Sequence, residues 1–285
     1  MKIAIDSYCY HRYFGEVYEN QESPGRSMTY EDFLKRAIEL EVDGVSLETC
    51  FLTGTDESYL KKLREILDQG ELEPVVAWGH PDGLEGGKNV AALDDMKLHF
   101  RTCKLLNAKV MRIVGSSLAF RHEPHGPQIE RLSKLLKEPA QLAESHGIKL
   151  AMENHFDFTT DEILEILNNV GSDCLGVTFD TGNALRICEN PVEAAQKLVK
   201  HIYATHVKDL EPLYGGNPQD WYFFASVPLG RGIVDIPSIV NVLEEARYEG
   251  LCTIEIDYLH PDYDDEDPSV SESVRYLRKL NKSAA

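Results

Sequence analysis

Short apolar runs alternate with longer amphipathic runs along the whole chain. The short runs have the length and the β-branched content that are typical of buried strands. They predict eight strands, at residues 2–7, 44–48, 74–78, 109–114, 149–153, 175–180, 202–206 and 251–256. The longer runs repeat apolar residues three and four positions apart, which places these residues on one face of a helix. They predict eight helices, at residues 30–40, 57–68, 89–106, 127–145, 161–168, from 190 onward, 236–248 and from 267 to about 280.

Strict alternation of strands and helices implies a parallel sheet, because a crossover between parallel strands contains a helix. Eight such units close into a (β/α)₈ barrel. An open doubly wound sheet is the competing fold, but it usually carries a glycine-rich phosphate loop after its first strand. Residues 6–19 contain no GxGxxG pattern. We therefore expect an α/β protein in which residues 1–285 form a single (β/α)₈ TIM barrel domain.

Two long segments, residues 8–28 and 209–235, follow predicted strand ends and carry many aromatic residues. They are expected on the face where barrel enzymes build their active sites. One interpretation is a lid with aromatic walls for a sugar-like ligand. The other is a self-packed loop or a contact within a homo-oligomer, since exposed aromatic side chains serve either purpose.

Acidic residues outnumber basic ones in this 285-residue chain by 48 to 29, and the net charge is −19. Such a surface repels nucleic acid and anionic membranes, so neither is expected as a partner. No apolar stretch approaches the ~20 residues of a membrane span, and the first residues do not form a signal peptide. The six cysteines form no CxxC pair, which favours reduced thiols and a cytoplasmic location.

Four successive predicted strands end in an ionisable residue: Glu153, Asp180, His206 and Glu255. These side chains should converge, because the C-terminal ends of barrel strands meet on one face. Each residue alone would ordinarily be a solvated or salt-bridged group. Three carboxylates crowded together, however, are costly without a counter-charge. Three oxygen donors and one imidazole suit Mn²⁺, Mg²⁺ or Co²⁺, so the pattern predicts a site for one divalent metal ion.

The segments around these residues resemble the sugar phosphate isomerase/epimerase superfamily, which has a xylose isomerase-like TIM barrel. The matching stretches, in chain order, are AMENH (151–155), VTFDTGN (177–183), THVKD (205–209), PLGRGIVD (228–235) and TIEID (253–257). The resemblance implies that Glu153, Asp180, His206 and Glu255 hold one divalent ion, with Mn²⁺ expected and Mg²⁺ or Co²⁺ as alternatives.

In the ketose 3-epimerases of that superfamily two glutamates also act as acid and base, and Glu153 and Glu255 match their positions. The metal polarises the carbonyl and hydroxyl groups of the substrate. One glutamate then removes a proton, and the other returns one to the resulting enediolate. The resemblance thus implies an isomerase or epimerase of a keto-sugar or related polyol.

Five further residues are expected to bind substrate. The resemblance implies that Glu48, His80 and His155 face the pocket. Asn183 stands where the ketose epimerases usually carry histidine; its amide can hydrogen-bond a hydroxyl but cannot carry a proton. Arg231 is expected either to bind a hydroxyl or carboxylate group of the substrate or to cap the long segment over residues 209–235.

Lys208 is expected to point toward the helices, with a structural pairing to Asp209.

Because Asn183 stands where the ketose epimerases usually carry histidine, a lyase with the same barrel fold remains an alternative. Such a lyase would be an inosose or dehydroshikimate dehydratase, or an enzyme of β-elimination from a 3-keto-glycoside. DNA repair by an endonuclease with this barrel is disfavoured, because residues 115–116 and Asn183 replace expected histidines and the net charge opposes DNA. A barrel that only binds is disfavoured by the complete ligand set. The expected substrate is an unphosphorylated keto-sugar or cyclitol.

Overall fold

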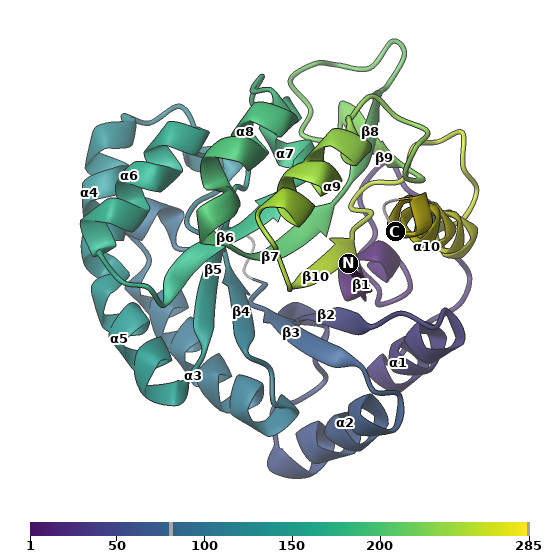
Figure 1. The fold of residues 1–285 in the computed structure, drawn as a ribbon, viewed down its shortest axis with the longest axis horizontal. Coiled ribbons are helices and arrows are strands. Elements are labelled where there is room, and N and C mark those ends of the chain that lie inside the picture. The colour runs from purple at the N-terminus through teal and green to yellow at the C-terminus, as the bar shows by residue number, and fades with distance from the viewer. Residues whose placement is uncertain (80–81, 284–285) are drawn as a thin grey trace.

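The computed structural model describes residues 1–79 and 82–283 and contains a closed eight-stranded barrel (Figure 1). All neighbouring barrel strands are parallel. Around the barrel the order is β1 (Lys2–Asp6), β10 (Leu251–Ile254), β7 (Ile202–Val207), β6 (Leu175–Asp180), β5 (Lys149–Glu153), β4 (Val110–Ile113), β3 (Glu73–Ala77) and β2 (Gly44–Glu48). The first and last barrel strands pair directly, with Ile5 opposite Ile254. The predicted α/β barrel is confirmed.

Helices form a ring outside these strands (Figure 1). They are α1 (Tyr30–Glu39), α2 (Glu57–Gln69), α3 (Val90–Leu106), α4 (His125–Leu135), α5 (Lys137–His146), α6 (Thr160–Val170), α7 (Thr181–Arg186), α8 (Pro191–Leu198), α9 (Ile236–Glu245) and α10 (Glu266–Ser283). Local sequence sets several of their starts. Thr159 and Glu162 form a capping box for α6, and Asn190 caps α8 with Pro191 at its first position.

The helices differ from the prediction in two places. The helix expected over residues 127–145 is divided into α4 and α5 at Leu136. Pro139 has no N–H to donate to the carbonyl of Leu135, so the helix restarts there with the proline in its first turn. In addition, the short helix α7 begins directly after β6, because Asp180 Oδ1 accepts hydrogen bonds from the backbone N–H groups of Gly182 and Asn183.

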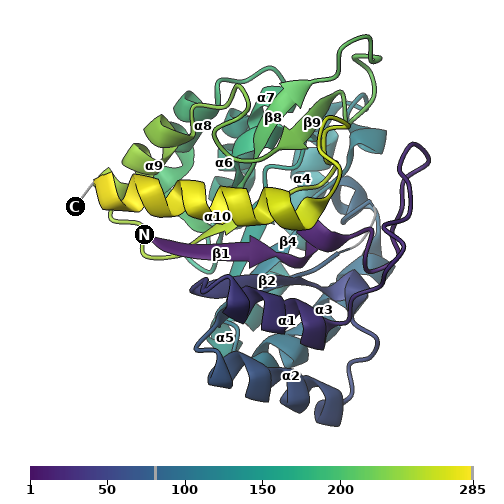
Figure 2. The same ribbon diagram turned by 90° about the vertical axis from the view of Figure 1, so that its right-hand side faces the viewer.

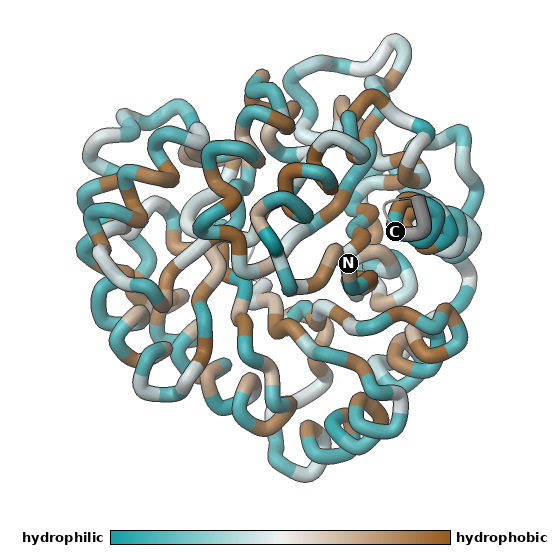
Figure 3. Tube along the Cα trace, viewed as in Figure 1, coloured by the Kyte–Doolittle hydropathy of each residue, from teal (hydrophilic) through white to brown (hydrophobic). Residues whose placement is uncertain are grey.

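Apolar side chains fill the barrel and the layer between strands and helices. The largest fully buried ones include Trp78, Phe100, Phe158 and Phe179. Figure 3 shows hydrophobic residues recurring along the strands and on the helices around them. None of the helices within the described residues combines the length and apolarity needed to cross a bilayer.

The segment expected as a loop over residues 209–235 contains an antiparallel pair of strands, β8 (Asp209–Pro212) and β9 (Phe224–Val227). Asp209 holds the far end of this segment, because its carboxylate accepts from the N–H groups of Gly230, Gly232 and Val234. The segment from residue 8 to 28 begins with a 3₁₀ turn (Ser7–Tyr10). In Figure 2 both segments project from the end of the barrel toward which the β1 arrow points.

An ion pair ties the first long segment to the last helix. The Arg12 guanidinium contacts the Glu266 carboxylate, with Nη2 2.7 Å from Oε2, and Glu266 is fully buried. In Figure 2 α10 lies alongside β1, and the Met1 amino group donates to Asn281 at 3.4 Å. These contacts join the two ends of the chain across the seam between β1 and β10.

We predict that Arg12→Met lowers the free energy of unfolding by about 3 kcal/mol, because it leaves the buried Glu266 carboxylate without its cation. Urea unfolding followed by circular dichroism measures the change. Lys197→Met is the matched control: its ion pair with Asp161 is exposed, so less than about 1 kcal/mol should be lost. Adding Glu266→Gln to Arg12→Met should recover stability; a double variant as unstable as the single one would contradict this assignment.

Candidate metal centre and pocket

Four consecutive strands of one half of the barrel carry the predicted metal ligands. Glu153 ends β5, Asp180 ends β6, His206 lies near the end of β7, and Glu255 directly follows β10. All four side chains are buried, and one potential ligand atom from each lies within 4.8 Å of the others. The structure therefore brings together the four residues expected from the strand ends; we call them the ligand set.

The two ring nitrogens of His206 face different carboxylates. Nδ1 faces the ligand set, 2.6 Å from Glu255 Oε2, 3.5 Å from Glu153 Oε1 and 3.9 Å from Asp180 Oδ2. Nε2 faces Asp6 Oδ2 at 3.5 Å, and Asp6 Oδ1 accepts from the backbone N–H of Tyr8. A carboxylate behind a ligating histidine holds the ring so that the opposite nitrogen is free to coordinate.

The donor set fits a divalent cation. Within the described residues, Asp180 Oδ2, His206 Nδ1 and Glu255 Oε2 are buried and make no well-aligned hydrogen bond, although each lies within ion-pair distance of a charged neighbour. Asp180 uses its other oxygen to cap α7, so Oδ2 is the atom it presents to the set. Oxygen-rich sites with one imidazole suit hard or borderline divalent ions.

Two buried cations flank the ligand set. Arg112, in the middle of β4, contacts Glu153 Oε2 at 2.5 Å and Glu48 Oε1 at 3.3 Å. Lys208 Nζ lies 2.9 Å from Asp180 Oδ2, 3.2 Å from Glu255 Oε2 and 2.9 Å from Asp257 Oδ2. Arg112 therefore joins one member of the ligand set, and Lys208 two, to a further carboxylate outside the set.

The pKa values of the buried carboxyl groups differ, because some lie beside these cations and others are governed by burial. Burial opposes ionisation of Glu153, but the Arg112 guanidinium and His206 outweigh it and hold the pKa of Glu153 well below its usual range. His206 and Lys208 likewise lower the pKa of Glu255 against the effect of burial. Burial prevails at Glu48 and raises its pKa to about 8. Both glutamates of the ligand set are thus carboxylates at neutral pH.

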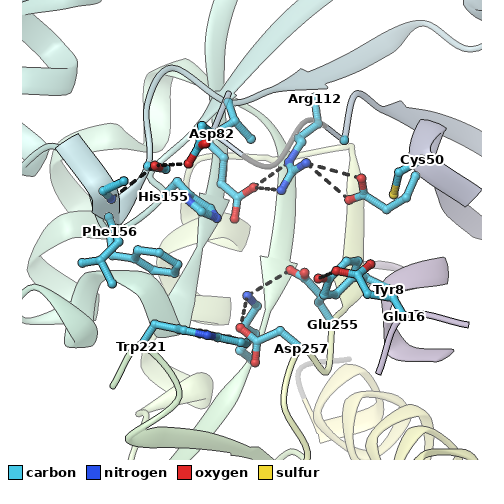
Figure 4. A pocket seen from close by; sticks show the side chains of 18 of the residues that line it. Tyr8, Glu16, Cys50, Asp82, Arg112, His155, Phe156, Trp221, Glu255 and Asp257 are labelled. Atoms are coloured by element: carbon cyan, nitrogen blue, oxygen red, sulfur yellow. Dashed lines mark hydrogen bonds and ion pairs between the residues drawn. The ribbon is translucent and has the colours of Figure 1, made fainter. Parts of the chain in front are cut away.

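Two members of the ligand set, Glu153 and Glu255, line a cavity of about 550 Å³ at the barrel mouth (Figure 4). Glu48 and His155 line it, as expected. Burial lowers the pKa of His155 to about 4, so its ring is neutral at pH 7. Figure 4 shows Arg112 on one side of the cavity, with Phe156 and Trp221 on another.

Asn183 and Arg231, which are also expected to bind substrate, have other partners in the structure. Asn183 is buried, and both ends of its amide are used: Nδ2 donates to Glu153 Oε1 at 3.0 Å, and Oδ1 accepts from Arg186 at 3.1 Å. The structure thus places Asn183 as a support for Glu153. Arg231 is exposed and pairs with Glu272 at 2.7 Å, so it does not reach the cavity. His80 lies outside the described residues.

The expectation for Lys208 is wrong, because this side chain points into the cavity. Residues two apart on a strand share a face, and Lys208 is two positions from inward-facing His206. The same spacing relates Asp257 to Glu255 and would have found it. Arg112 lies within β4 and not at its end, so the pattern of strand ends does not include it, although a charged residue within an apolar strand is a recognisable signal.

Comparison with known proteins supports the fold and gives the family. The sequence profile described as xylose isomerase-like TIM barrel matches residues 34–280. An inosose dehydratase of Clostridium botulinum is 29% identical over 159 residues, which are 52% of this chain and 51% of that protein. The chain spans about half the length of the curated relatives it matches.

Solved structures match over the whole chain at low identity, which shows a shared fold. A D-tagatose 3-epimerase-like protein has a TM-score of 0.72 at 21% identity, and the match covers 100% of both chains. The IOLI protein, whose structure holds a zinc atom, has a TM-score of 0.77 at 17% identity with 98% of both chains covered.

We predict that Asp6→Asn weakens divalent metal binding about tenfold. An asparagine amide facing Nε2 favours the tautomer that protonates Nδ1, the nitrogen directed at the ligand set. Calorimetric titration with Mn²⁺ measures the affinity. Asp43→Asn is the matched control: Asp43 accepts from the Ile3 N–H at the opposite end of the barrel. Unchanged affinity in Asp6→Asn would show that Asp6 does not orient His206.

Proposed function

The chain belongs to the xylose isomerase-like TIM barrel family, and from this premise we propose that it is a divalent-metal-dependent isomerase or epimerase of an uncharged keto-sugar or related polyol. One observation carries the proposal. Glu153 and Glu255, on the two outermost strands of the ligand set, are both buried and both held ionised by neighbouring cations. A substrate lying against the set therefore has a carboxylate on each side.

The proposed reaction divides the work among these residues. A bound divalent ion would polarise the substrate carbonyl and make the adjacent C–H bond acidic. One of the two glutamate carboxylates takes that proton. The other must first take up a proton from water, which it then gives to the carbanion from its own side, so one proton is taken from solvent for each one released. Asn183 and Arg112 hold Glu153 in place through its two oxygens. Proton abstraction next to a carbonyl is the first step of both the isomerase and the lyase reaction.

Charge pairing supports an uncharged substrate. Among the described lining residues the two cations are Arg112 and Lys208, and each lies within 3.3 Å of carboxylates. A phosphate group would have to displace one of these pairs. We also propose Mn²⁺ as the ion and the cytoplasm as the location; the oxygen-rich ligand set supports the first and the free cysteines support the second.

A lyase is the second candidate, and the position of Lys208 favours it. After proton removal, the electron pair of the C–H bond would form a C=C bond while a hydroxyl leaves from the next carbon. The hydroxyl would depart as water with the abstracted proton, and the Lys208 ammonium beside Glu255 is placed to donate a hydrogen bond to it. The inosose dehydratases among the curated relatives agree with this outcome.

We predict deuterium incorporation next to the carbonyl when the Mn²⁺-loaded protein meets its substrate in D₂O. Proton NMR of a panel of ketoses, inosose and 3-keto-glycosides would follow the exchange. A new epimer or isomer carrying deuterium supports the primary proposal, whereas a new alkene or enone signal selects the lyase. Absence of exchange with every member would contradict both.

We predict that Glu153→Gln and Glu255→Gln each lower turnover about 10²–10⁴-fold, since each removes a proton-transfer group. Both should also lower the metal content of the purified protein, measured by elemental analysis, because a neutral amide is a weaker ligand than a carboxylate. Glu193→Gln, an exposed change in the first turn of α8, is the control. Full activity of either variant would remove that glutamate from the proposed mechanism.

A further inference from the structure

The cavity extends well beyond the ligand set. The set occupies β5, β6, β7 and β10, which form one continuous half of the barrel. The lining also includes residues from the segments after β1, β2, β3 and β4, which form the other half. The cavity therefore crosses the barrel mouth from the ligand set to the side of β4.

The far side of the cavity offers an apolar ledge. Val114 directly follows β4, and Leu118 and Ala119 begin the 3₁₀ turn Leu118–Phe120, which Ser117 caps. Leu118 is half-buried and Ala119 is exposed, so their apolar atoms face the cavity without being packed away. Phe156, from the segment after β5, continues this surface toward the ligand set.

Two aromatic rings at the mouth are held rigidly. The Arg186 guanidinium lies 5.6 Å from the Trp221 ring centroid and 5.7 Å from that of Phe156. Trp221 also meets Tyr18 edge-on at 5.1 Å, which joins the two long segments. Rings fixed in this way present flat apolar faces without further loss of conformational freedom on binding.

The size of the cavity exceeds that of a single sugar ring. A hexose has twelve non-hydrogen atoms, and even at the ~30 Å³ that each water occupies in the liquid it fills less than about 360 Å³. The cavity measures about 550 Å³. A hexose bound at the ligand set would leave the ledge uncovered.

The ledge also excludes a second charged group. Val114, Leu118, Ala119 and Phe156 carry no charge, and the nearby Asp82 carboxylate, which accepts from Ser117 Oγ at 2.9 Å, repels anions. Within the described lining, both cations are already paired beside the ligand set. The group that fits against these side chains is therefore apolar and carries no negative charge.

We infer that the ledge is a second subsite for an apolar aglycone, and that the substrate is an uncharged keto-glycoside, not a free keto-sugar. The inference rests on the proposed function for the position of the sugar ring. It adds the requirement that the substrate span from the ligand set to Leu118 and Ala119.

The test uses tryptophan fluorescence, since the chain has two tryptophans and they differ in position. Trp78 is fully buried, whereas Trp221 lines the cavity. The probes are the methyl and phenyl glycosides of 3-keto-β-D-glucose, mixed with the Mg²⁺-loaded full chain in a stopped-flow instrument, so that the initial quench is recorded before turnover. We expect the phenyl glycoside to bind about tenfold more tightly, and Trp221→Phe to abolish the quench.

Variants locate the preference on the ledge. Leu118→Ser and Ala119→Trp should each reduce the ratio of the two affinities toward one, the first by removing apolar surface and the second by filling the space. Tyr214→Ser is the matched control, because Tyr214 is fully exposed in the segment between β8 and β9 and does not line the cavity; this change should leave the ratio unchanged.

The outcomes separate this inference from the proposed function. Equal affinities for the two glycosides, quenching by neither, or tighter binding of 3-keto-glucose 6-phosphate would overturn the aglycone subsite, even if deuterium exchange with a free keto-sugar upheld the proposed function. Preferential binding of the phenyl glycoside without any deuterium exchange would uphold the subsite and remove the proposed reaction.

Discussion

The barrel mouth depends on the compensation of buried negative charge. Six carboxyl groups there are nearly inaccessible to solvent: Asp6, Glu48, Glu153, Asp180, Glu255 and Asp257. Burying an unpaired carboxylate costs several kcal/mol, so the fold must supply positive partners from neighbouring strands. Arg112, Arg186 and Lys208 provide three positive charges in the protein. A divalent ion in the ligand set, with His206 as a neutral ligand, would add two more.

This compensation leaves the cations little freedom to recognise a ligand by charge. Arg112 is held between Glu153 and Glu48, and Lys208 between Asp257 and the ligand set. Specificity then has to come from hydroxyl contacts near the set and from apolar surface farther away. The rigid rings and the uncharged ledge on the β4 side are consistent with that division, because apolar surface discriminates by shape without disturbing the charge balance.

Much of this architecture follows from local sequence patterns. The barrel is predictable because each strand and helix has its own periodicity, and the ligand set because parallel strands end on one face. Pairings between distant segments are not local. The sequence does not indicate that Arg231 pairs with Glu272 on the surface, or that residues 209–212 and 224–227 form strands. The inward direction of Lys208 and Asp257 was predictable, because each lies two residues after a member of the ligand set and residues two apart on a strand share a face.

The two proposed acid–base groups are linked behind the ligand set by a continuous chain of contacts. From Glu153 it passes to Asn183 at 3.0 Å, Arg186 at 3.1 Å, Asp257 at 2.5 Å and Lys208 at 2.9 Å, and it ends at Glu255 at 3.2 Å. An asparagine amide cannot carry a proton, so this chain fixes the positions of the two carboxylates and does not relay protons between them. A proton taken up by one glutamate must therefore leave through the substrate or through water. The fate of the carbanion is then decided by what the substrate places beside Lys208: a leaving hydroxyl there favours elimination, and its absence leaves return of a proton as the remaining course.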